Sequence, residues 1–291
     1  MRCKRYIMPL VALVAAMALA CILSTGCASS GSSISDSTDM GAEVVEATGE
    51  ESASDALAKA DAPKSPEDEK DEAEDDAAAS GEGFVVCIDA GHQLSGDSSQ
   101  EPIGPGASET KARVTGGTSG ASSGLAEYEV NLAVALKLRD YLESKGVEVV
   151  MVRETNDVNI SNSERAAVAN DAGADLFIRL HCDGSEDSSR AGFSTLIPGY
   201  NDWTGSIVDE SREAGEIIQR VVLEVTGAAD AGVVERTDLS GFNWCEVPTV
   251  LCEMGFMSNP DEDLRLATEE YQQLLAKGIG DGALEYLETT R

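Results

Sequence analysis

Residues 84–92 read FVVCIDAGH, and this stretch decides the fold. It begins with mostly apolar residues rich in β-branched and aromatic types, which are typical of a buried strand. The small residues Ala90 and Gly91 then form a turn that carries His92, one of two histidines in the chain. We therefore expect a strand that aims an imidazole from the edge of a sheet, and the rest of the chain can be searched for partners of that ring.

Strand patterns and helix patterns alternate after this first strand. The expected strands span residues 147–153, 175–184, 191–198 and 247–255, and the expected helices span residues 127–145, 161–173 and 206–226. From residue 259 onward we expect the chain to be helical, closing with a helix over residues 271–287. This order predicts one α/β domain over residues 84–291, with a largely parallel, mixed central sheet and helices on both of its faces.

A long passage rich in glycine, serine and proline separates His92 from the first helix. Residues 93–124 include EPIGPG and TGGTSGASSG, and we expect a loop without regular structure. Loops of this length inside a compact domain are usually functional or mobile. We expect this one to border the active site.

Two more chemically active side chains follow expected strands. His181 and Glu253 each lie at the end of such a strand, and Glu127 begins the helix after the long loop. In open α/β sheets, sites lie beyond the carboxyl ends of the strands. Each residue alone has a simpler explanation: a strand-end histidine is commonly structural, and a glutamate in the first turn of a helix is favoured by the helix dipole.

Taken together, these residues predict a metal site. Two imidazoles and a carboxylate bind zinc while leaving one position for water, which is the pattern of catalytic zinc sites. A further glutamate that does not bind the metal can take a proton from the water. Glu253 is the most telling of the four residues, because a carboxylate inside an apolar run is costly without a partner.

The amino terminus has the features of an export signal. Three basic residues precede an apolar run over residues 7–23, which is short for a membrane span. The following LSTGC resembles the lipobox of bacterial lipoproteins, with Cys27 as the lipidated residue, although Ser24 stands where a leucine is usual. Cys21 is an alternative lipidation site, and an uncleaved anchor is an alternative to cleavage. We expect residues 1–27 to be a signal peptide with its lipobox.

Charge and composition define the next segment. Residues 28–83 are small and acidic with almost no large apolar side chain, so we expect a disordered linker that acts as a tether. An acidic tail with its own partner is the alternative. The chain has a net charge of −32, and residues 84–291 carry −21 of it. A surface this negative repels phosphate backbones and excludes nucleic acid as a partner.

The cysteines of the expected domain show no metal-binding spacing. None of Cys87, Cys182, Cys245 and Cys252 forms a C-x-x-C pair, and three of them lie in apolar stretches. Free buried cysteine behaves as a small hydrophobic residue. We therefore expect core packing, with a disulfide as the alternative.

Four blocks of this sequence carry a resemblance to a known family. IDAGH, GLAEYEVNLAVAL, FIRLHCDG and PTVLCEMGFMSNPDED, in this order, resemble the signature blocks of the zinc-dependent N-acetylmuramoyl-L-alanine amidases of the amidase-3 type. The resemblance implies that His92, Glu127 and His181 bind one zinc ion and that Glu253 is the catalytic glutamate. It also implies that the substrate is peptidoglycan, cleaved at the amide between N-acetylmuramic acid and the first L-alanine of the stem peptide.

The chain also departs from the family pattern. Gln93 and Leu94 replace the usual pair of glycines, Asp183 replaces a common asparagine, and the Gly-rich loop lengthens the spacing between His92 and Glu127. Arg153, Arg179 and Trp244 are candidates for contacts with glycan or peptide, and structural roles are their alternatives.

The signal and the resemblance together give a hypothesis for the whole protein. We expect an extracytoplasmic enzyme anchored by lipid to the outer face of the cell membrane, with peptidoglycan as its partner. One alternative is an inactive amidase-like lipoprotein that binds peptidoglycan or regulates another hydrolase. A tethered solute-binding protein is another, but it would need two lobes. The sequence does not indicate an oligomeric state.

Overall fold

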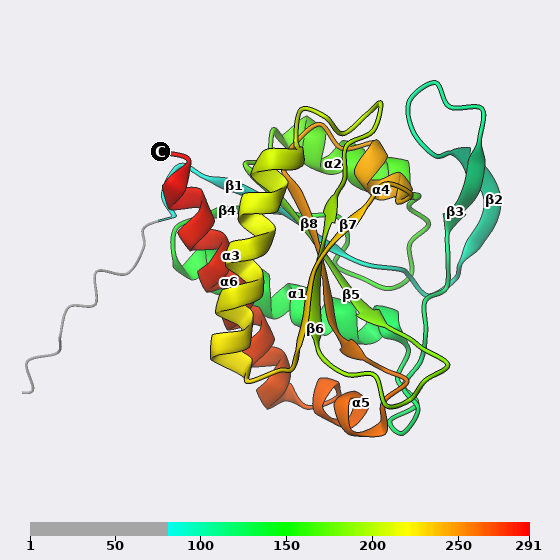
Figure 1. The fold of residues 1–291 in the computed structure, drawn as a ribbon, viewed down its shortest axis with the longest axis vertical. Helices are drawn as coiled ribbons and strands as arrows, with labels where there is room; N and C mark the ends of the chain where they lie inside the picture. The colour runs from blue at the N-terminus through cyan, green and yellow to red at the C-terminus, as the bar shows by residue number, and fades with distance from the viewer. Residues whose placement is uncertain (1–80) are drawn as a thin grey trace, which may run out of the picture. The chain divides into compact units, whose positions relative to one another are not determined.

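The structure is a computed structural model that describes residues 81–291. The signal peptide and Cys27 expected in residues 1–27, and nearly all of the linker expected in residues 28–83, lie outside the described residues. Six strands form one sheet (Figure 1), in the spatial order β4 (Glu148–Met151), β1 (Val85–Ala90), β5 (Leu176–Asp183), β8 (Thr249–Phe256), β6 (Phe193–Pro198) and β7 (Asp230–Arg236).

The sheet is mixed, as predicted. Strands β4, β1, β5 and β8 are parallel to one another, whereas β6 pairs antiparallel with β8 and parallel with β7. Strand β7 was not predicted. The residues 93–124, predicted as an irregular loop, contain a separate two-stranded hairpin of β2 (Asp97–Pro102) and β3 (Thr110–Val114), so that prediction was wrong in this part.

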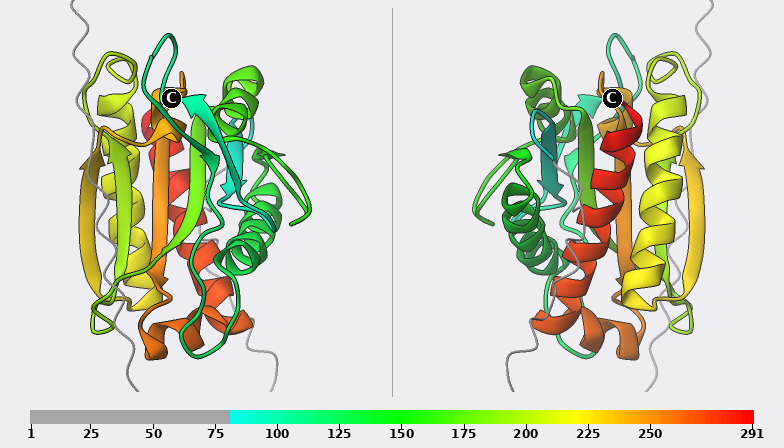
Figure 2. Two further views of the ribbon diagram at one scale, coloured as in Figure 1. Left: turned by 90° about the vertical axis from the view of Figure 1, so that its right-hand side faces the viewer. Right: turned by 90° about the vertical axis from the view of Figure 1, so that its left-hand side faces the viewer.

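Helices cover both faces of the sheet, and Figure 2 shows the layers from two sides. One face packs against α1 (Glu127–Ser144), α3 (Val208–Thr226) and α6 (Glu269–Thr289), and the other against α2 (Asn162–Ala172) and the short α4 (Ser240–Asn243). Helix α5 (Pro260–Leu266) follows β8. No helix formed by residues 81–291 has both the length and the apolar character needed to cross a membrane.

The alternation of side chains along the strands assigns each residue to a face. Val86 and Ile88 of β1 point into the larger core with α1 and α6, while Cys87 packs on the α2 side. The four cysteines of residues 81–291 are all buried and free, which confirms the prediction of core packing.

Helices α3 and α6 approach each other closely through glycine. A Cβ atom at Gly278 would lie 3.0 Å from the Cα atom of Val222, and one at Gly282 would lie 2.8 Å from the Cα atom of Ile218. Any larger residue at these two positions of α6 would push the helices apart.

Candidate metal centre

Three predicted ligands meet at the carboxyl edge of the sheet. His92 comes from the turn after β1, Glu127 is the first residue of α1, and His181 lies in β5. His92 Nε2 and His181 Nδ1 lie 3.1 and 3.2 Å from Glu127 Oε1, and 3.1 Å from each other. The three donor atoms therefore form a nearly equilateral triangle.

This triangle fits a zinc ion. Tetrahedral zinc with ligand bonds of 2.0–2.1 Å places its ligand atoms about 3.3 Å apart. Burial lowers the pKa of His181 to about 4, so its ring is neutral at pH 7. Burial alone would raise the pKa of Glu127, but hydrogen bonds with His181 and His92 hold that pKa well below its usual range. A neutral imidazole and an ionised carboxylate are the protonation states that bind metal.

The backbone around His92 orients its ring. His92 has a left-handed backbone conformation with φ of 59°, which is uncommon for a residue other than glycine. Its Nδ1 lies 2.9 Å from the carbonyl oxygen of Thr115. When Nδ1–H donates to that oxygen, the lone pair of Nε2 faces Glu127 and His181.

Three donors fix the carboxylate of Glu127. The amide of Thr118 donates to Oε2 (2.9 Å), and the amide of Cys182 donates to Oε1 (3.1 Å). The side-chain amide of Asn131, one turn further along α1, donates to Oε1 at 3.2 Å. The carboxylate is thus held in place by neighbouring groups before any ligand binds.

Glycine allows the close packing of the ligand side chains. A Cβ atom at Gly91 would lie 2.4 Å from His181 Nε2, and one at Gly117 would lie 2.8 Å from Glu127 Oε2. His181 Nε2 is buried and has no hydrogen-bond partner within residues 81–291. The Nδ1 atom of His181, and not Nε2, faces the other two ligands.

Glu253 lies beside this triangle. It is the register partner of His181 on the neighbouring strand β8, and both side chains line one cavity. Its Oε2 is buried and lacks a hydrogen-bond partner in the part of the chain that the structure describes. Burial, together with the charges of Glu127 and Asp183, raises the pKa of Glu253 to about 8. A carboxyl group with a pKa near neutrality can both accept and return a proton.

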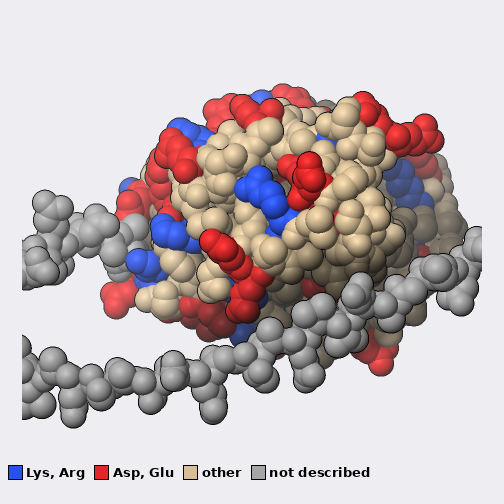
Figure 3. Space-filling model, turned by 90° about the horizontal axis from the view of Figure 1, so that it is seen from below, with Lys and Arg blue, Asp and Glu red and all other residues tan. Residues whose placement is uncertain are grey.

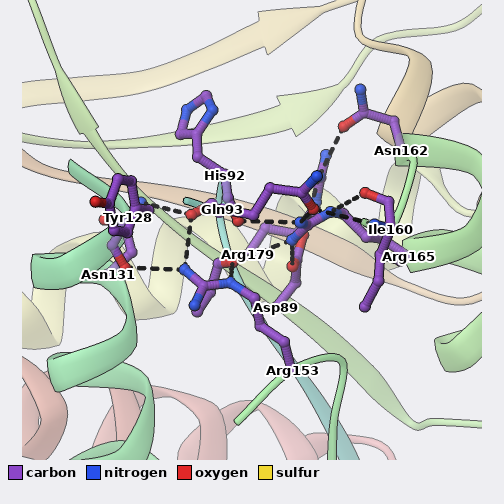
Figure 4. A network of polar contacts seen from close by, with 12 residues as sticks. Asp89, His92, Gln93, Tyr128, Asn131, Arg153, Ile160, Asn162, Arg165 and Arg179 are labelled. Carbon is purple, nitrogen blue, oxygen red and sulfur yellow. Dashed lines mark hydrogen bonds and ion pairs between the residues drawn. The ribbon is translucent and has the colours of Figure 1, made fainter. Parts of the chain in front are cut away.

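A buried ionic network lies beneath His92 (Figure 4). Asp89 of β1 is fully buried and pairs with Arg165 of α2 at 2.5 Å and with Arg179 of β5 at 3.0 Å. These two guanidinium groups hold the pKa of Asp89 below its usual range despite burial, which alone would raise it. This network was not predicted from the sequence, although an aspartate within an apolar strand was a signal for it.

The same network binds the turn that carries the first ligand. Arg165 donates to the carbonyl oxygen of His92 and to Gln93 Oε1, both at 3.0 Å, and Arg153 donates to the carbonyl oxygens of Ala90 and Gly91 at 2.7 and 3.1 Å. Gln93 is fully buried, so this departure from the family pattern serves the packing of the turn.

Arg153, Arg179 and Trp244 were predicted to contact substrate or to have structural roles. Arg153 is almost fully buried and is structural. Burial and the neighbouring charge of Arg165 lower the pKa of Arg153 to about 10. The indole of Trp244 donates to the carbonyl oxygen of Pro102 on the hairpin. Arg179 is buried against Asp89 but also lines the cavity beside Glu253.

Comparisons with known proteins identify one family. The profile of the family Amidase_3, described as N-acetylmuramoyl-L-alanine amidase, matches residues 86–285. The chain is 32% identical over 220 residues to the N-acetylmuramoyl-L-alanine amidase Rv3717 of Mycobacterium tuberculosis, which covers 71% of this chain and 88% of that protein. It is 29% identical over 204 residues to the amidase LytC of Bacillus subtilis, covering 70% of this chain and 36% of LytC.

Solved structures show the same fold. The amidase Ami1 of Mycobacterium smegmatis has a TM-score of 0.65 at 26% identity, and the match covers 72% of this chain and 99% of Ami1. An N-acetylmuramoyl-L-alanine amidase of Clostridium difficile has a TM-score of 0.59 at 27% identity, and the match covers 73% of this chain and 100% of that one. The predicted single α/β domain with a mixed sheet is therefore confirmed.

Proposed function

The chain belongs to the N-acetylmuramoyl-L-alanine amidase family, and from this membership we propose a zinc-dependent peptidoglycan hydrolase in residues 84–291. Its reaction is hydrolysis of the amide between the lactyl group of N-acetylmuramic acid and L-alanine. The observation that carries the proposal is the triangle of donor atoms from His92, Glu127 and His181, with Glu253 on the adjacent strand.

The proposed roles follow from the positions of these side chains. His92 Nε2, His181 Nδ1 and Glu127 Oε1 would hold the zinc ion. When bound, zinc supplies Lewis-acid chemistry: it lowers the pKa of water to about 7 and polarises a carbonyl group. Glu253 accepts a proton from the attacking water, and it returns that proton to the alanine nitrogen as the carbon–nitrogen bond breaks.

Two variants separate metal binding from proton transfer. Glu253→Gln keeps the three ligands, so we expect stoichiometric zinc and a loss of turnover on the order of 10²–10⁴-fold. His181→Ala removes a ligand, so we expect loss of both zinc and turnover. Zinc is measured by elemental analysis, and turnover by mass spectrometry of muropeptides, with free stem peptide bearing an amino-terminal alanine as the product. Cleavage by Glu253→Gln at the wild-type rate would show that the role given to Glu253 is wrong.

The proposal extends to the place of the enzyme in the cell. The lipobox-like sequence before Cys27 supports a lipoprotein on the outer face of the cell membrane, with residues 28–83 as its tether. A Cys27→Ser protein would then leave the membrane fraction, whereas Cys21→Ser would stay there. Membrane retention of Cys27→Ser would contradict lipidation at this residue.

A further inference from the structure

Two cavities flank the predicted metal ligands. The first has a volume of about 560 Å³ and is lined by Glu127, Glu186, Ser185 and Ser258 and by residues 115–118. The second, of about 470 Å³, is lined by His181, Glu253 and a mixture of basic and leucine side chains. His92 and Thr115 line both cavities, so the two form one groove that passes the metal centre.

The position of Glu253 assigns a direction to the substrate in this groove. Glu253 lines the second cavity and not the first. In the proposed function, which this step rests on, Glu253 delivers a proton to the alanine nitrogen, so the departing peptide must lie on its side. The stem peptide then occupies the second cavity, and the sugar lies toward the first, whose serine, threonine and glycine residues suit a carbohydrate.

Two basic side chains that share one acidic partner line the second cavity. Arg236 forms two hydrogen bonds with the carboxylate of Asp238, at 2.8 and 3.0 Å, and Lys111 Nζ lies 3.6 Å from the same carboxylate. Two cations thus share one anion, so these three side chains together carry a net charge of about +1, and Glu253 is the other acidic residue that lines this cavity. Both basic side chains are partly exposed and able to reach a ligand.

The apolar part of the same cavity fits the residue next to the scissile bond. Leu196, Leu239 and Leu251 line it and belong to one apolar cluster with the buried Phe242. A small methyl side chain such as that of alanine can pack against these leucines. The next residue of an extended peptide lies about 3.5 Å further along the chain, which is within the dimensions of this cavity.

We propose that the second cavity is a stem-peptide subsite that selects a free carboxylate on the second residue of the stem. Arg236 and Lys111 bind this carboxylate, and the alanine side chain lies against the leucines. The matching peptide with a carboxamide at this position keeps its shape but loses the charge. It therefore binds less tightly.

The test uses two N-acetylmuramoyl tripeptides that differ only in a carboxylate or a carboxamide on the second residue. We expect wild-type zinc-loaded enzyme to favour the carboxylate by about threefold to fivefold in kcat/KM, mainly through KM, as for a partly exposed ion pair. Arg236→Gln and Lys111→Gln should each reduce this preference, as measured by the ratio of kcat/KM on the two peptides. Asp238→Asn should increase the preference for the carboxylate, because this substitution removes the anion that competes for Arg236 and Lys111.

Arg220→Gln is the matched control. Arg220 is a somewhat more exposed arginine on α3 that pairs with Glu224 and Glu285, away from the groove, so its loss should leave the preference unchanged. Equal cleavage of both peptides by wild type would overturn the subsite while leaving the proposed function intact. Cleavage of neither peptide would instead overturn the proposed function. A preference that persists in the Arg236→Gln, Lys111→Gln double variant would also overturn the subsite.

Discussion

Gly91 shows how a residue without a side chain can control a metal ligand. Its Cα atom packs against the His181 ring, and a Cβ atom there would overlap that ring. We predict that Gly91→Ala displaces His181 Nδ1 and weakens zinc binding by at least about tenfold, since misplaced ligands lose coordination energy. Competition with a chelator measures the affinity. Gly205→Ala, at an open turn position, is the control and should bind zinc as wild type does.

His181 also makes stability depend on pH. Burial lowers its pKa from 6.5 to about 4 in the folded state. Between these values the unfolded chain binds a proton that the folded chain does not bind, so the free energy of unfolding falls as pH falls from about 6.5 to about 4. This contribution is on the order of 3 kcal/mol.

We predict that thermal unfolding of metal-free protein shows this loss of stability over that pH range. His181→Asn, which cannot take up the proton, should show a shallower dependence on pH. Equal slopes for the two proteins would contradict the assignment to His181.

Functional residues could be predicted from the sequence where a polar side chain stands at the end of an apolar strand. His92 and His181 follow or end apolar strands, and the structure brings them together with Glu127. Asp89 was not assigned a role, because its partners Arg165 and Arg179 lie 76 and 90 residues away, and no local pattern relates them.

At the scale of elements, the β2–β3 hairpin explains why residues 93–124 were wrongly predicted as an irregular loop. Its strands do not alternate between apolar and polar residues, because polar contacts, and not apolar packing, attach the hairpin to the rest of the domain. Glu101 is buried and accepts hydrogen bonds from the amide of Asn162 (3.1 Å) and from the amide and hydroxyl of Ser163, at the start of α2. Propensity scales do not detect such contacts.

We predict that Glu101→Gln weakens the attachment of the hairpin to α2 without unfolding the domain. The charge at the amino terminus of α2 is lost, at a cost of about 1 kcal/mol. Hydrogen exchange should increase in residues 97–114 and stay unchanged in β1 and β5. Glu109→Gln, an exposed residue of the same hairpin, is the control. Because Lys111 lines the peptide-side cavity, the Glu101→Gln variant should also show a higher KM.

Strand β7 was missed for a related reason. It is an edge strand that includes Gly232 and ends in charged residues, so most of its side chains are not buried and no apolar alternation remains. The central strands β1, β5 and β8 bury nearly every residue, and these were the strands predicted with nearly correct bounds.

At the scale of the whole domain, negative charge dominates. Figure 3 shows acidic side chains spread over one face, with a few basic ones near its middle. A domain of net charge −21 is repelled by a wall that also carries carboxylates, and salt screens this repulsion.

We predict that cleavage of intact, insoluble peptidoglycan speeds up between low and moderate ionic strength. Cleavage of a small soluble muropeptide that carries the carboxylate should slow over the same range, because salt weakens its local contact with Arg236 and Lys111. Rates measured on both substrates in one salt series check this. Parallel changes in the two rates would contradict it.

The close packing of α6 on α3 through Gly278 and Gly282 has a consequence for the order of folding. Helix α6 contains three glycines, at positions 278, 280 and 282, and each costs about 0.8–1 kcal/mol relative to alanine. By itself, this helix is therefore too weak to form, and it gains its structure only when it docks. It also supplies Leu275, Ile279 and Leu287 to the main core. The sheet, and with it the metal centre, can consequently become stable only after α6 has docked.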